Sequence, residues 1–232
     1  MIHLKKKLVL VLLFILLIAA FSGCKKKNDD VPAFSSNELQ FRNPSKGSAI
    51  ATIETGKGTI KAVLYPSEAP KAVENFITHA ENGYYDNNLF HRVVKDFVIQ
   101  SGDPTETGNG GDSIWKIPFE DEYSDNLHHY RGAIGYANSE KDKNKSQFYI
   151  IDGINITENL ISQMKDAGFP DSVIEAYKEV GGHPTLDYRY TVFGQVIEGI
   201  EVVDEIAALE TDKFNRPLDD VRIKTITIEY VE

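Results

Sequence analysis

The segment FHRVVKDFVIQSGDPTETGNGG, residues 90–111, places an arginine inside an apolar run. Phe97 and Gln100 follow Arg92 at short spacing, and a glycine-rich turn closes the segment. Apolar runs bounded by glycine are typical of strands, and such a strand can form the wall of a pocket. A permanent cation in that wall could act on an electron-rich atom of a bound molecule. The alternative is a surface arginine on an ordinary strand.

Two other motifs suggest ligand sites but fail on their context. A phosphate-binding loop needs a helix N-terminus after its glycines, usually with lysine and serine or threonine. The glycine-rich residues 102–111 run instead into SIWKIPF, which is typical of a strand. Residues 142–146, DKNKS, imitate the start of a calcium loop, but Gln147 and Gly153 stand where that loop requires glycine and glutamate.

Several kinds of catalytic site are excluded by their missing motifs. The sequence has no G-x-S-x-G nucleophile motif, no H-E-x-x-H metal motif and no pair of cysteines. The adjacent His128 and His129 are not at the spacing of helical metal ligands, and we expect them on a loop surface. The acidic cluster at residues 120–122 is typical of a solvated turn. We therefore expect neither a metal nor a cofactor.

The N-terminus has the features of an export signal. Lys5 to Lys7 precede an apolar run from Leu8 to Ala20, and this run is short for a membrane-spanning helix, which needs about 20 residues. The next residues, FSGC, resemble the lipobox of bacterial lipoproteins. That resemblance implies a signal peptide at residues 1–23, cleavage before Cys24 and lipidation of this cysteine. An uncleaved anchor is the alternative.

The 232 residues are enough for one good-sized domain, and their net charge is −10. Removal of residues 1–23, which contain three lysines and no acidic residue, would change the net charge to −13. Such an acidic protein is a poor candidate for nucleic acid, whose affinity comes largely from Lys and Arg contacts to phosphates. Residues 24–46 are polar and rich in Ser, Asn and Pro, and we expect a flexible tether there.

After residue 46 the chain consists of short apolar segments separated by glycine turns, which favours a barrel or a sandwich. Two strands joined by a turn at residues 55–58 are expected in residues 49–66. Helical spacing of apolar residues predicts helices within residues 66–83 and 200–209. Further strands are expected at Leu89–Val94, Phe97–Ser101, Ile114–Ile117, Ala133–Ala137, Phe148–Ile151, Thr191–Val196 and Lys224–Val231.

Four segments resemble motifs of the cyclophilin-type peptidyl-prolyl cis-trans isomerases, in the order of that family. They are FHRVVKDFVIQSGDPT, GAIGYAN, KSQFYI and LDYRYTVFGQVIEGIEVVDEI, which begin at residues 90, 132, 145 and 186. The resemblance covers nearly all of residues 47–232, which we expect to form one isomerase domain. It implies a mainly-β fold, a closed eight-stranded antiparallel barrel capped by two α-helices, with a helical insert at residues 152–184.

The family's reaction is rotation about an X–Pro bond, whose planar amide has a rotation barrier of about 18–20 kcal/mol. In the twisted transition state the nitrogen lone pair is no longer delocalised, so the nitrogen accepts a hydrogen bond. A guanidinium beside it stabilises the twisted form more than either planar form, which is what catalysis requires. Arg92 matches the family's catalytic arginine. Gln100 matches the glutamine that orients this arginine and contacts the substrate backbone.

The resemblance also implies which residues bind the substrate. An apolar wall that holds the proline ring is matched by Phe97, Val98, Tyr149 and Leu186. Strand faces bury such residues anyway, so an ordinary core role is the alternative. Ala137 and Asn138 match the strand that pairs with the substrate backbone, and the other matches to substrate-binding positions are Gln147 and Tyr190.

We therefore expect an isomerase without metal or cofactor that acts on proline-containing unfolded or flexible polypeptides. It would be a monomer of the bacterial cell envelope, lipid-anchored to a membrane on the periplasmic side or at the cell surface. The alternative is a non-catalytic module that holds proline-containing chains in the same groove, as a chaperone. Arg92 and Gln100 favour the enzyme, because degenerate members of the family tend to lose them.

Two features depart from the family pattern. Thr185 stands where an aromatic residue often lies, which predicts weaker binding of the cyclic peptide cyclosporin. The insert at residues 152–184 replaces a short loop and contains two short helical patterns, the first with Thr157 as its candidate cap. It leaves the barrel after Tyr149 and returns before Leu186, so it could form a rim over the proline site. A helical hairpin packed elsewhere for stability is the alternative.

Overall fold

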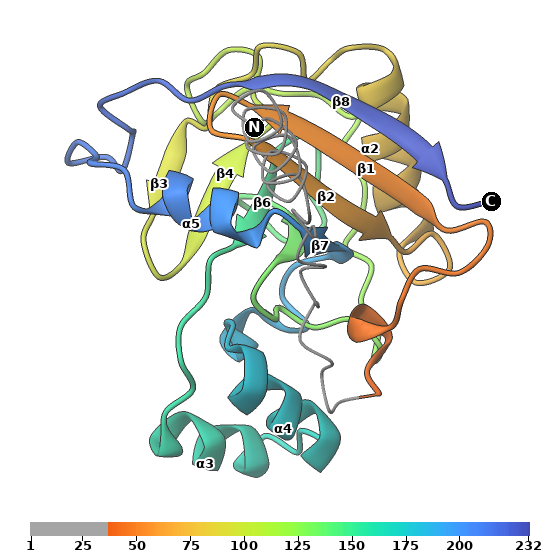
Figure 1. Cartoon of the computed structure of the whole chain (residues 1–232), viewed down its shortest axis with the longest axis vertical. Coiled ribbons are helices and arrows are strands. Elements are labelled where there is room, and N and C mark those ends of the chain that lie inside the picture. Colours follow the sequence, from red (N-terminus) through yellow and green to blue (C-terminus); the bar gives the residue numbers. More distant parts are fainter. Residues whose placement is uncertain (1–36) are drawn as a thin grey trace, which may run out of the picture. The chain divides into compact units, whose positions relative to one another are not determined.

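The computed structural model describes residues 37–232, so the predicted signal peptide and Cys24 lie outside the described residues. The described part contains one antiparallel sheet with the strand order β3-β4-β6-β5-β7-β2-β1-β8 (Figure 1). None of its helices has the length and hydrophobicity that crossing a membrane requires. The strands are β1 (Ala49–Thr55), β2 (Thr59–Leu64), β3 (Arg92–Val94), β4 (Val98–Ser101), β5 (Ala133–Tyr136), β6 (Phe148–Ile151), β7 (Val192–Glu198) and β8 (Ile223–Tyr230).

The two faces of the sheet bury different apolar clusters, because successive side chains of a strand point to opposite faces. Ile99, Ile134 and Ile150 face the main core, which the helices α2 (Pro70–Glu81) and α5 (Ile200–Ala207) cover. Their neighbours Val98, Ala133 and Tyr149 face a second apolar cluster on the other side. The strands therefore carry a structural core on one face and leave the other face available for a site.

Helix α2 is fixed to the sheet by polar contacts as well as by its apolar face. Asn75 donates hydrogen bonds to the Tyr136 hydroxyl (2.8 Å) and to the Lys145 carbonyl (2.7 Å). The carboxylate of Glu122 accepts from the backbone N–H groups of Lys71 and Ala72, which have no partner inside the helix. The acidic cluster predicted as a solvated turn thus supplies the N-terminal cap of α2.

The sheet is open, and the prediction of a closed barrel is wrong. β3 and β8 form its two edges and do not pair with each other. The segments before them meet at an isolated bridge between Leu89 and Arg222, and the outer edge of β3 is covered by a loop whose Asn215 carbonyl accepts from the Val93 N–H. That loop contains Pro217 and has Asn215 at φ 64°, so it cannot extend a ladder between the edges.

The other predicted elements agree with the structure except at one segment. Residues 114–117, predicted as a strand, form a turn in which Lys116 has φ 62°. The mainly-β fold, the eight strands and the two helices that cover the core are confirmed. Four residues are too few for their apolar pattern to distinguish a strand from a turn. Here the Ser113 hydroxyl donates a hydrogen bond to the Ile117 carbonyl and holds the turn.

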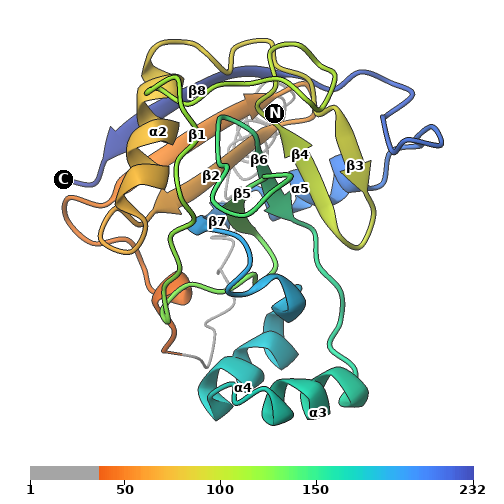
Figure 2. The same ribbon diagram turned by 180° about the vertical axis from the view of Figure 1, so that it is seen from behind.

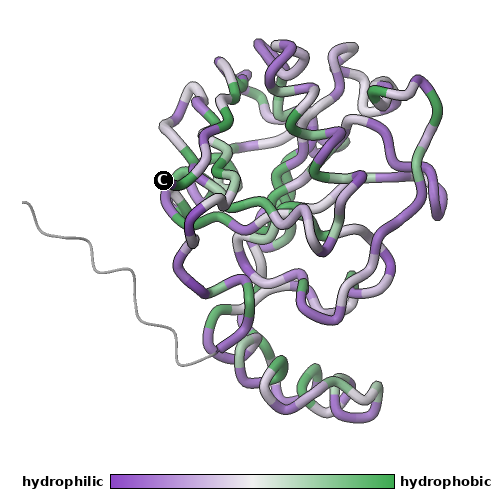
Figure 3. The backbone as a smooth tube through the Cα atoms, turned by 90° about the vertical axis from the view of Figure 1, so that its right-hand side faces the viewer, coloured by the Kyte–Doolittle hydropathy of each residue, from purple (hydrophilic) through white to green (hydrophobic). Residues whose placement is uncertain are grey.

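The insert forms two helices, α3 (Glu158–Asp166) and α4 (Asp171–Val180), that lie side by side away from the sheet (Figures 1 and 2). Thr157 caps α3, since its hydroxyl accepts from the Leu160 N–H. Hydrophobic and hydrophilic residues alternate along both helices (Figure 3). Their apolar faces enclose a third cluster, together with Tyr130, which precedes β5, and with Phe41.

The folded part begins before residue 47, inside the segment predicted as a tether. Residues 39–41 form a 3-10 turn, and the side chain of Gln40 is buried. Its amide donates to the His128 carbonyl and to the Gln195 side chain, both at 2.9 Å, and accepts from the His128 N–H at 2.6 Å. Residues around Gln40 are therefore docked on the domain rather than free.

We expect Gln40→Ala to lower the free energy of unfolding by about 2 kcal/mol, because it leaves buried polar groups of His128 and Gln195 without their partner. Arg42→Ala, at the exposed end of the same turn, is the matched control and should cost less than about 0.5 kcal/mol. Urea unfolding of both variants measures the difference. Equal costs for the two variants would contradict the docked turn.

Candidate functional site

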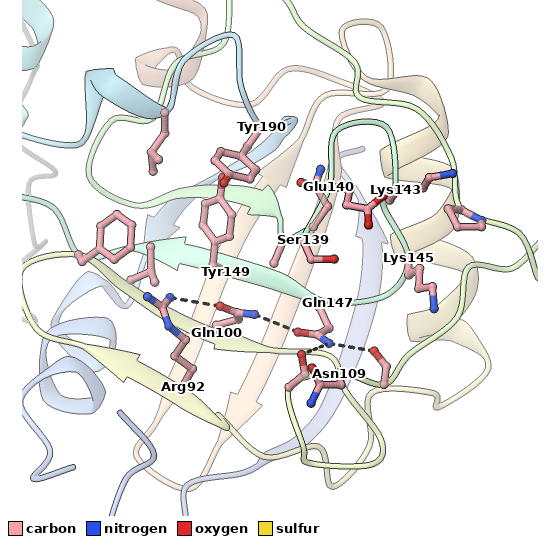
Figure 4. Close-up of a pocket in the computed structure, with 18 residues that line it drawn as sticks. Arg92, Gln100, Asn109, Ser139, Glu140, Lys143, Lys145, Gln147, Tyr149 and Tyr190 are labelled. Carbon is pink, nitrogen blue, oxygen red and sulfur yellow. Dashed lines mark hydrogen bonds between the residues drawn. The ribbon is translucent and has the colours of Figure 1, made fainter. Parts of the chain in front are cut away.

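A cavity of about 550 Å³ opens beside β4 and β6, on the face of the sheet opposite the main core (Figure 4). All ten residues that the sequence predicts for catalysis and substrate binding line this one cavity. They are Arg92, Phe97, Val98, Gln100, Ala137, Asn138, Gln147, Tyr149, Leu186 and Tyr190. The prediction did not name the remaining lining residues, Gly108, Asn109, Gly110, Pro118, Ser139, Glu140, Lys143 and Lys145.

The β3–β4 hairpin positions the cation of the site. Its register pairs Arg92 with Gln100, so both side chains project from the same face. The guanidinium donates to the Gln100 side-chain oxygen at 3.3 Å and lies 5.5 Å from the centroid of the Phe97 ring. Burial lowers the pKa of Arg92, but the ordinary pKa of arginine is so far above neutral that the guanidinium stays charged at neutral pH. Among residues 37–232 no carboxylate forms an ion pair with it.

Two glutamines hold the arginine in a chain of hydrogen bonds whose direction is fixed (Figure 4). Arginine only donates, so the oxygen of Gln100 accepts and its amide nitrogen donates to the oxygen of Gln147, at 2.9 Å. The amide nitrogen of Gln147 then donates to the carbonyls of Gly108 (3.1 Å) and Gly110 (2.8 Å). The guanidinium is thereby tied to the glycine-rich loop through neutral groups only.

The glycine-rich loop is shaped by the buried carboxylate of Asp103. This carboxylate accepts backbone hydrogen bonds from Thr105 (2.8 Å), Gly108 (2.7 Å) and Gly110 (3.0 Å). Burial alone would raise the pKa of Asp103, but these hydrogen bonds lower it below its ordinary value. A side chain at Gly110 would collide with Asp103, since its Cβ would lie 2.3 Å from the carboxylate oxygen. The loop is therefore built around an internal anion, and its glycines let it close.

An apolar wall lies beside the guanidinium in the cavity. Phe97, Val98 and Leu186 contribute to it together with Tyr149, whose ring is edge-on to that of Tyr190 with 6.4 Å between the centroids. The strand pairing places Gly135 opposite Tyr149, where a Cβ would lie 2.7 Å from the tyrosine oxygen. The absence of a side chain on Gly135 gives the ring its space.

The far end of the cavity is polar. Figure 4 shows Glu140, Lys143 and Lys145 at the end opposite Arg92. The side-chain amide of Asn138 is engaged within the protein, since it donates to Asp121 (2.9 Å) and to Asn144 (3.0 Å). The cavity thus joins an apolar slot with a cation beside it to a charged, open end, which suits an extended peptide with one apolar ring.

Beneath Tyr149 lies a buried cluster that the sequence analysis missed. Asp187 accepts from Nδ1 of both His128 (2.9 Å) and His129 (2.7 Å), and from the Tyr177 hydroxyl (2.8 Å). Nε2 of His129 lies 2.8 Å from the Tyr149 hydroxyl. The side chains of both histidines and of Asp187 are at most 2% exposed, so the prediction of a loop surface for the histidines is wrong.

The Asp187 carboxylate carries the negative charge of this cluster. Burial alone would raise its pKa, but the hydrogen bonds from His128 and His129 lower it to about 2. Because an ionised carboxylate only accepts, Nδ1 of each histidine carries the proton. In the tautomer whose only proton is on Nδ1, Nε2 of His129 accepts the hydrogen bond of the Tyr149 hydroxyl. The sequence held no signal for this cluster, since Asp187 follows its histidine partners by 58 and 59 residues.

The insert does not form the rim that the sequence suggested. No residue of the segment 152–184 lines the cavity, which favours the alternative of a hairpin packed elsewhere. Within residues 37–232, no group of three or more His, Cys, Asp or Glu side chains is placed to hold a metal ion.

Comparison with known proteins gives a consistent result. The model of the family described as "Cyclophilin type peptidyl-prolyl cis-trans isomerase/CLD" matches residues 50–228. A Staphylococcus aureus (strain USA300) protein named "Putative peptidyl-prolyl cis-trans isomerase" is 46% identical over 184 residues, which are 79% of this chain and 93% of that protein. A Staphylococcus saprophyticus protein of the same name is 44% identical over 194 residues, 83% of this chain and 98% of that protein.

Solved structures agree with the relatives. A crystal structure of a Cryptosporidium parvum cyclophilin-type peptidyl-prolyl cis-trans isomerase matches with a TM-score of 0.65 and 31% identity, over 80% of this chain and 99% of that one. A second structure of that isomerase, in the presence of the dipeptide Ala-Pro, matches with a TM-score of 0.63 and 32% identity, over 78% and 98% of the two chains.

We expect Asp187→Asn to reduce stability in a pH-dependent way. The folded-state pKa of Asp187 is about 2, below its unfolded value, so its contribution of about 2 kcal/mol is fully present above pH 4 and is lost as pH falls toward 2. The difference in unfolding free energy between wild type and variant should therefore shrink between pH 5 and pH 2. Urea unfolding across this range measures it, and a constant difference would contradict the assignment.

Proposed function

Because the chain belongs to the cyclophilin-type peptidyl-prolyl cis-trans isomerase family, we propose that it accelerates X–Pro rotation with Arg92 as its catalytic residue. The observation that carries this proposal is the position of the guanidinium. It lies beside the apolar wall of the cavity, is fixed by Gln100, and has no carboxylate partner among residues 37–232.

The substrate class follows from the shape and the lining of the cavity. A proline ring fits the slot formed by Phe97, Val98, Leu186 and Tyr149, and the residue before it then extends toward Arg92 and Gln100. The Ala-Pro dipeptide used with the related Cryptosporidium structure supports a proline-containing peptide as the ligand. At the charged far end of the cavity, the rest of a longer substrate chain can extend into solvent. Flexible polypeptides are therefore the natural substrates.

The geometry stabilises the transition state selectively. In the planar ground states the imide nitrogen has no free lone pair, so Arg92 gains little from contact with it. Rotation frees the lone pair, and the guanidinium then donates to it in a half-buried site where hydrogen bonds are stronger than in water. Gln100 and the Phe97 ring hold the guanidinium beforehand, so little reorganisation is needed during the reaction.

The cellular location of the protein is proposed from the sequence alone. We propose that residues 1–23 are an export signal and that Cys24 is lipidated, which would place the isomerase domain at a membrane of the cell envelope. Its clients would then be envelope proteins that fold near that membrane. Supporting features are the charged, apolar and small-residue regions of the N-terminus and the position of the single cysteine.

We expect Arg92→Ala to lower kcat/KM for an Ala-Pro peptide roughly 100-fold, because it removes the donor to the twisted nitrogen. Arg92→Lys should recover only part of the rate, since an ammonium cannot keep the planar contact with Gln100. A protease-free NMR exchange assay measures the rates, with Arg42→Ala as the control that stays active.

Two outcomes of this assay separate the hypotheses. An inactive wild-type protein that still binds Ala-Pro would replace the enzyme with the non-catalytic, peptide-holding module. An active Arg92→Ala variant would leave the isomerase in place but refute the role of the guanidinium.

We expect the full chain, expressed in a bacterium with lipoprotein processing, to incorporate labelled palmitate and to partition into a detergent phase. Cys24→Ala should lose both properties, because the thiol that carries the acyl chain is gone. Ser22→Ala, two residues earlier, is the control that keeps them. A wild-type chain that stays unlabelled and remains in the aqueous phase would argue against the anchor.

A further inference from the structure

The insert at residues 152–184 stays outside the cavity, but both of its ends contact the residues that form the cavity wall. Its first residue follows β6, which carries Tyr149, and its last residues precede Leu186. The contacts fall into two groups. One group reaches the β3–β4 turn with Phe97, and the other reaches Tyr149 from below.

The first group clamps the backbone of the β3–β4 turn. The carboxylate of Asp152 accepts from the Asp96 N–H at 2.6 Å, and the N–H groups of Asp152 and Gly153 donate to the Phe97 carbonyl at 3.0 and 3.4 Å. From the other end of the insert, Nε2 of His183 donates to the Asp96 carbonyl at 2.8 Å. Asp96 has φ 60°, a conformation that needs such support in a residue other than glycine.

The same clamp extends to the side chains that face the substrate. The His183 ring meets the Phe97 ring edge-on, with 4.8 Å between the centroids and 87° between the planes. Phe97 in turn lies under the guanidinium of Arg92 at 5.5 Å. A shift of His183 would therefore move the ring on which the cation rests.

The second group connects helix α4 to Tyr149. The Tyr177 hydroxyl and Nδ1 of His129 both donate to Asp187. With the His129 proton on Nδ1 alone, the Tyr149 hydroxyl donates to Nε2, 2.8 Å away. Tyr149 is only 5% exposed, and a buried hydroxyl without a partner would be costly. The acceptor on His129 directs this hydroxyl away from the proline slot and leaves only the ring face on the wall.

We propose that the insert positions the aromatic wall of the proline slot. His183 and Asp152 hold Phe97, and Tyr177 holds Tyr149 through Asp187 and His129. These are positioning residues, because none of these five residues lines the cavity where the substrate binds. The inference rests on the proposed isomerase function, and it explains how a hairpin outside the site contributes to it.

The first test is Tyr177→Phe, which removes one hydroxyl and keeps the packing of the ring. We expect about a fivefold increase in KM for an Ala-Pro peptide and in the Kd of the Ala-Pro dipeptide, with kcat within about twofold of wild type. The 15N resonances of the His129 imidazole should shift, because Asp187 loses a donor and interacts more strongly with Nδ1. Tyr188→Phe is the matched control, since that hydroxyl is exposed and donates to Asp125.

A double-mutant cycle separates positioning from general packing. In a Tyr149→Phe background there is no hydroxyl to direct, so Tyr177→Phe should no longer change the dipeptide Kd. His183→Leu tests the other contact group and should raise the dipeptide Kd about threefold, because Phe97 loses its edge contact. Thermal unfolding of each variant confirms that the measured protein is folded.

Unchanged Kd and KM in both Tyr177→Phe and His183→Leu would overturn the inference. It would also be overturned if Tyr177→Phe changed the dipeptide Kd as much in the Tyr149→Phe background as in the wild type. A fall in kcat alone, in proportion to lost folded protein, would also overturn it, because that is the signature of a purely structural hairpin. An inactive wild type would instead overturn the proposed function, whereas the dipeptide Kd values would still decide the inference.

Discussion

The site depends on a cation that is fixed by neutral groups. A carboxylate partner would hold Arg92 more tightly, but it would also compete with the weak acceptor that forms when an imide nitrogen leaves its plane. Gln100 accepts a hydrogen bond from the guanidinium without neutralising it, and Gln147 extends that support to the glycine-rich loop. The orientation is thus set while the charge remains available, which is the condition for preorganised electrostatic catalysis.

The sheet supplies this arrangement through its two faces. One face buries isoleucines and phenylalanines under α2 and α5, and this core sets the positions of β4, β5 and β6. The alternate residues of the same strands then form the site, so Gln100 and Tyr149 are neighbours across a ladder. The face opposite the main core also carries the relay from Tyr149 to Asp187, which Tyr177 connects to helix α4 of the insert.

Local signals predicted much of the fold and little of the buried polar structure. Alternation and glycine turns located all eight strands of the described sheet, and the resemblance of four segments identified ten residues that line one cavity. Closure of the barrel could not be predicted, because it depends on whether the chain around Pro217 can extend a ladder. Burial of His128 and His129 depends on Asp187, far along the chain, and a pair of histidines gives no sign of such a partner. The N-terminal anchor remains a prediction from sequence.

The most direct test of the account is a crystal structure of this chain with a bound Ala-Pro peptide. The account predicts the proline ring against Phe97 and Leu186, with a nitrogen of the Arg92 guanidinium within about 3.5 Å of the imide group. A proline ring bound instead at the charged end, between Glu140 and Lys143, with Arg92 turned toward solvent, would contradict it.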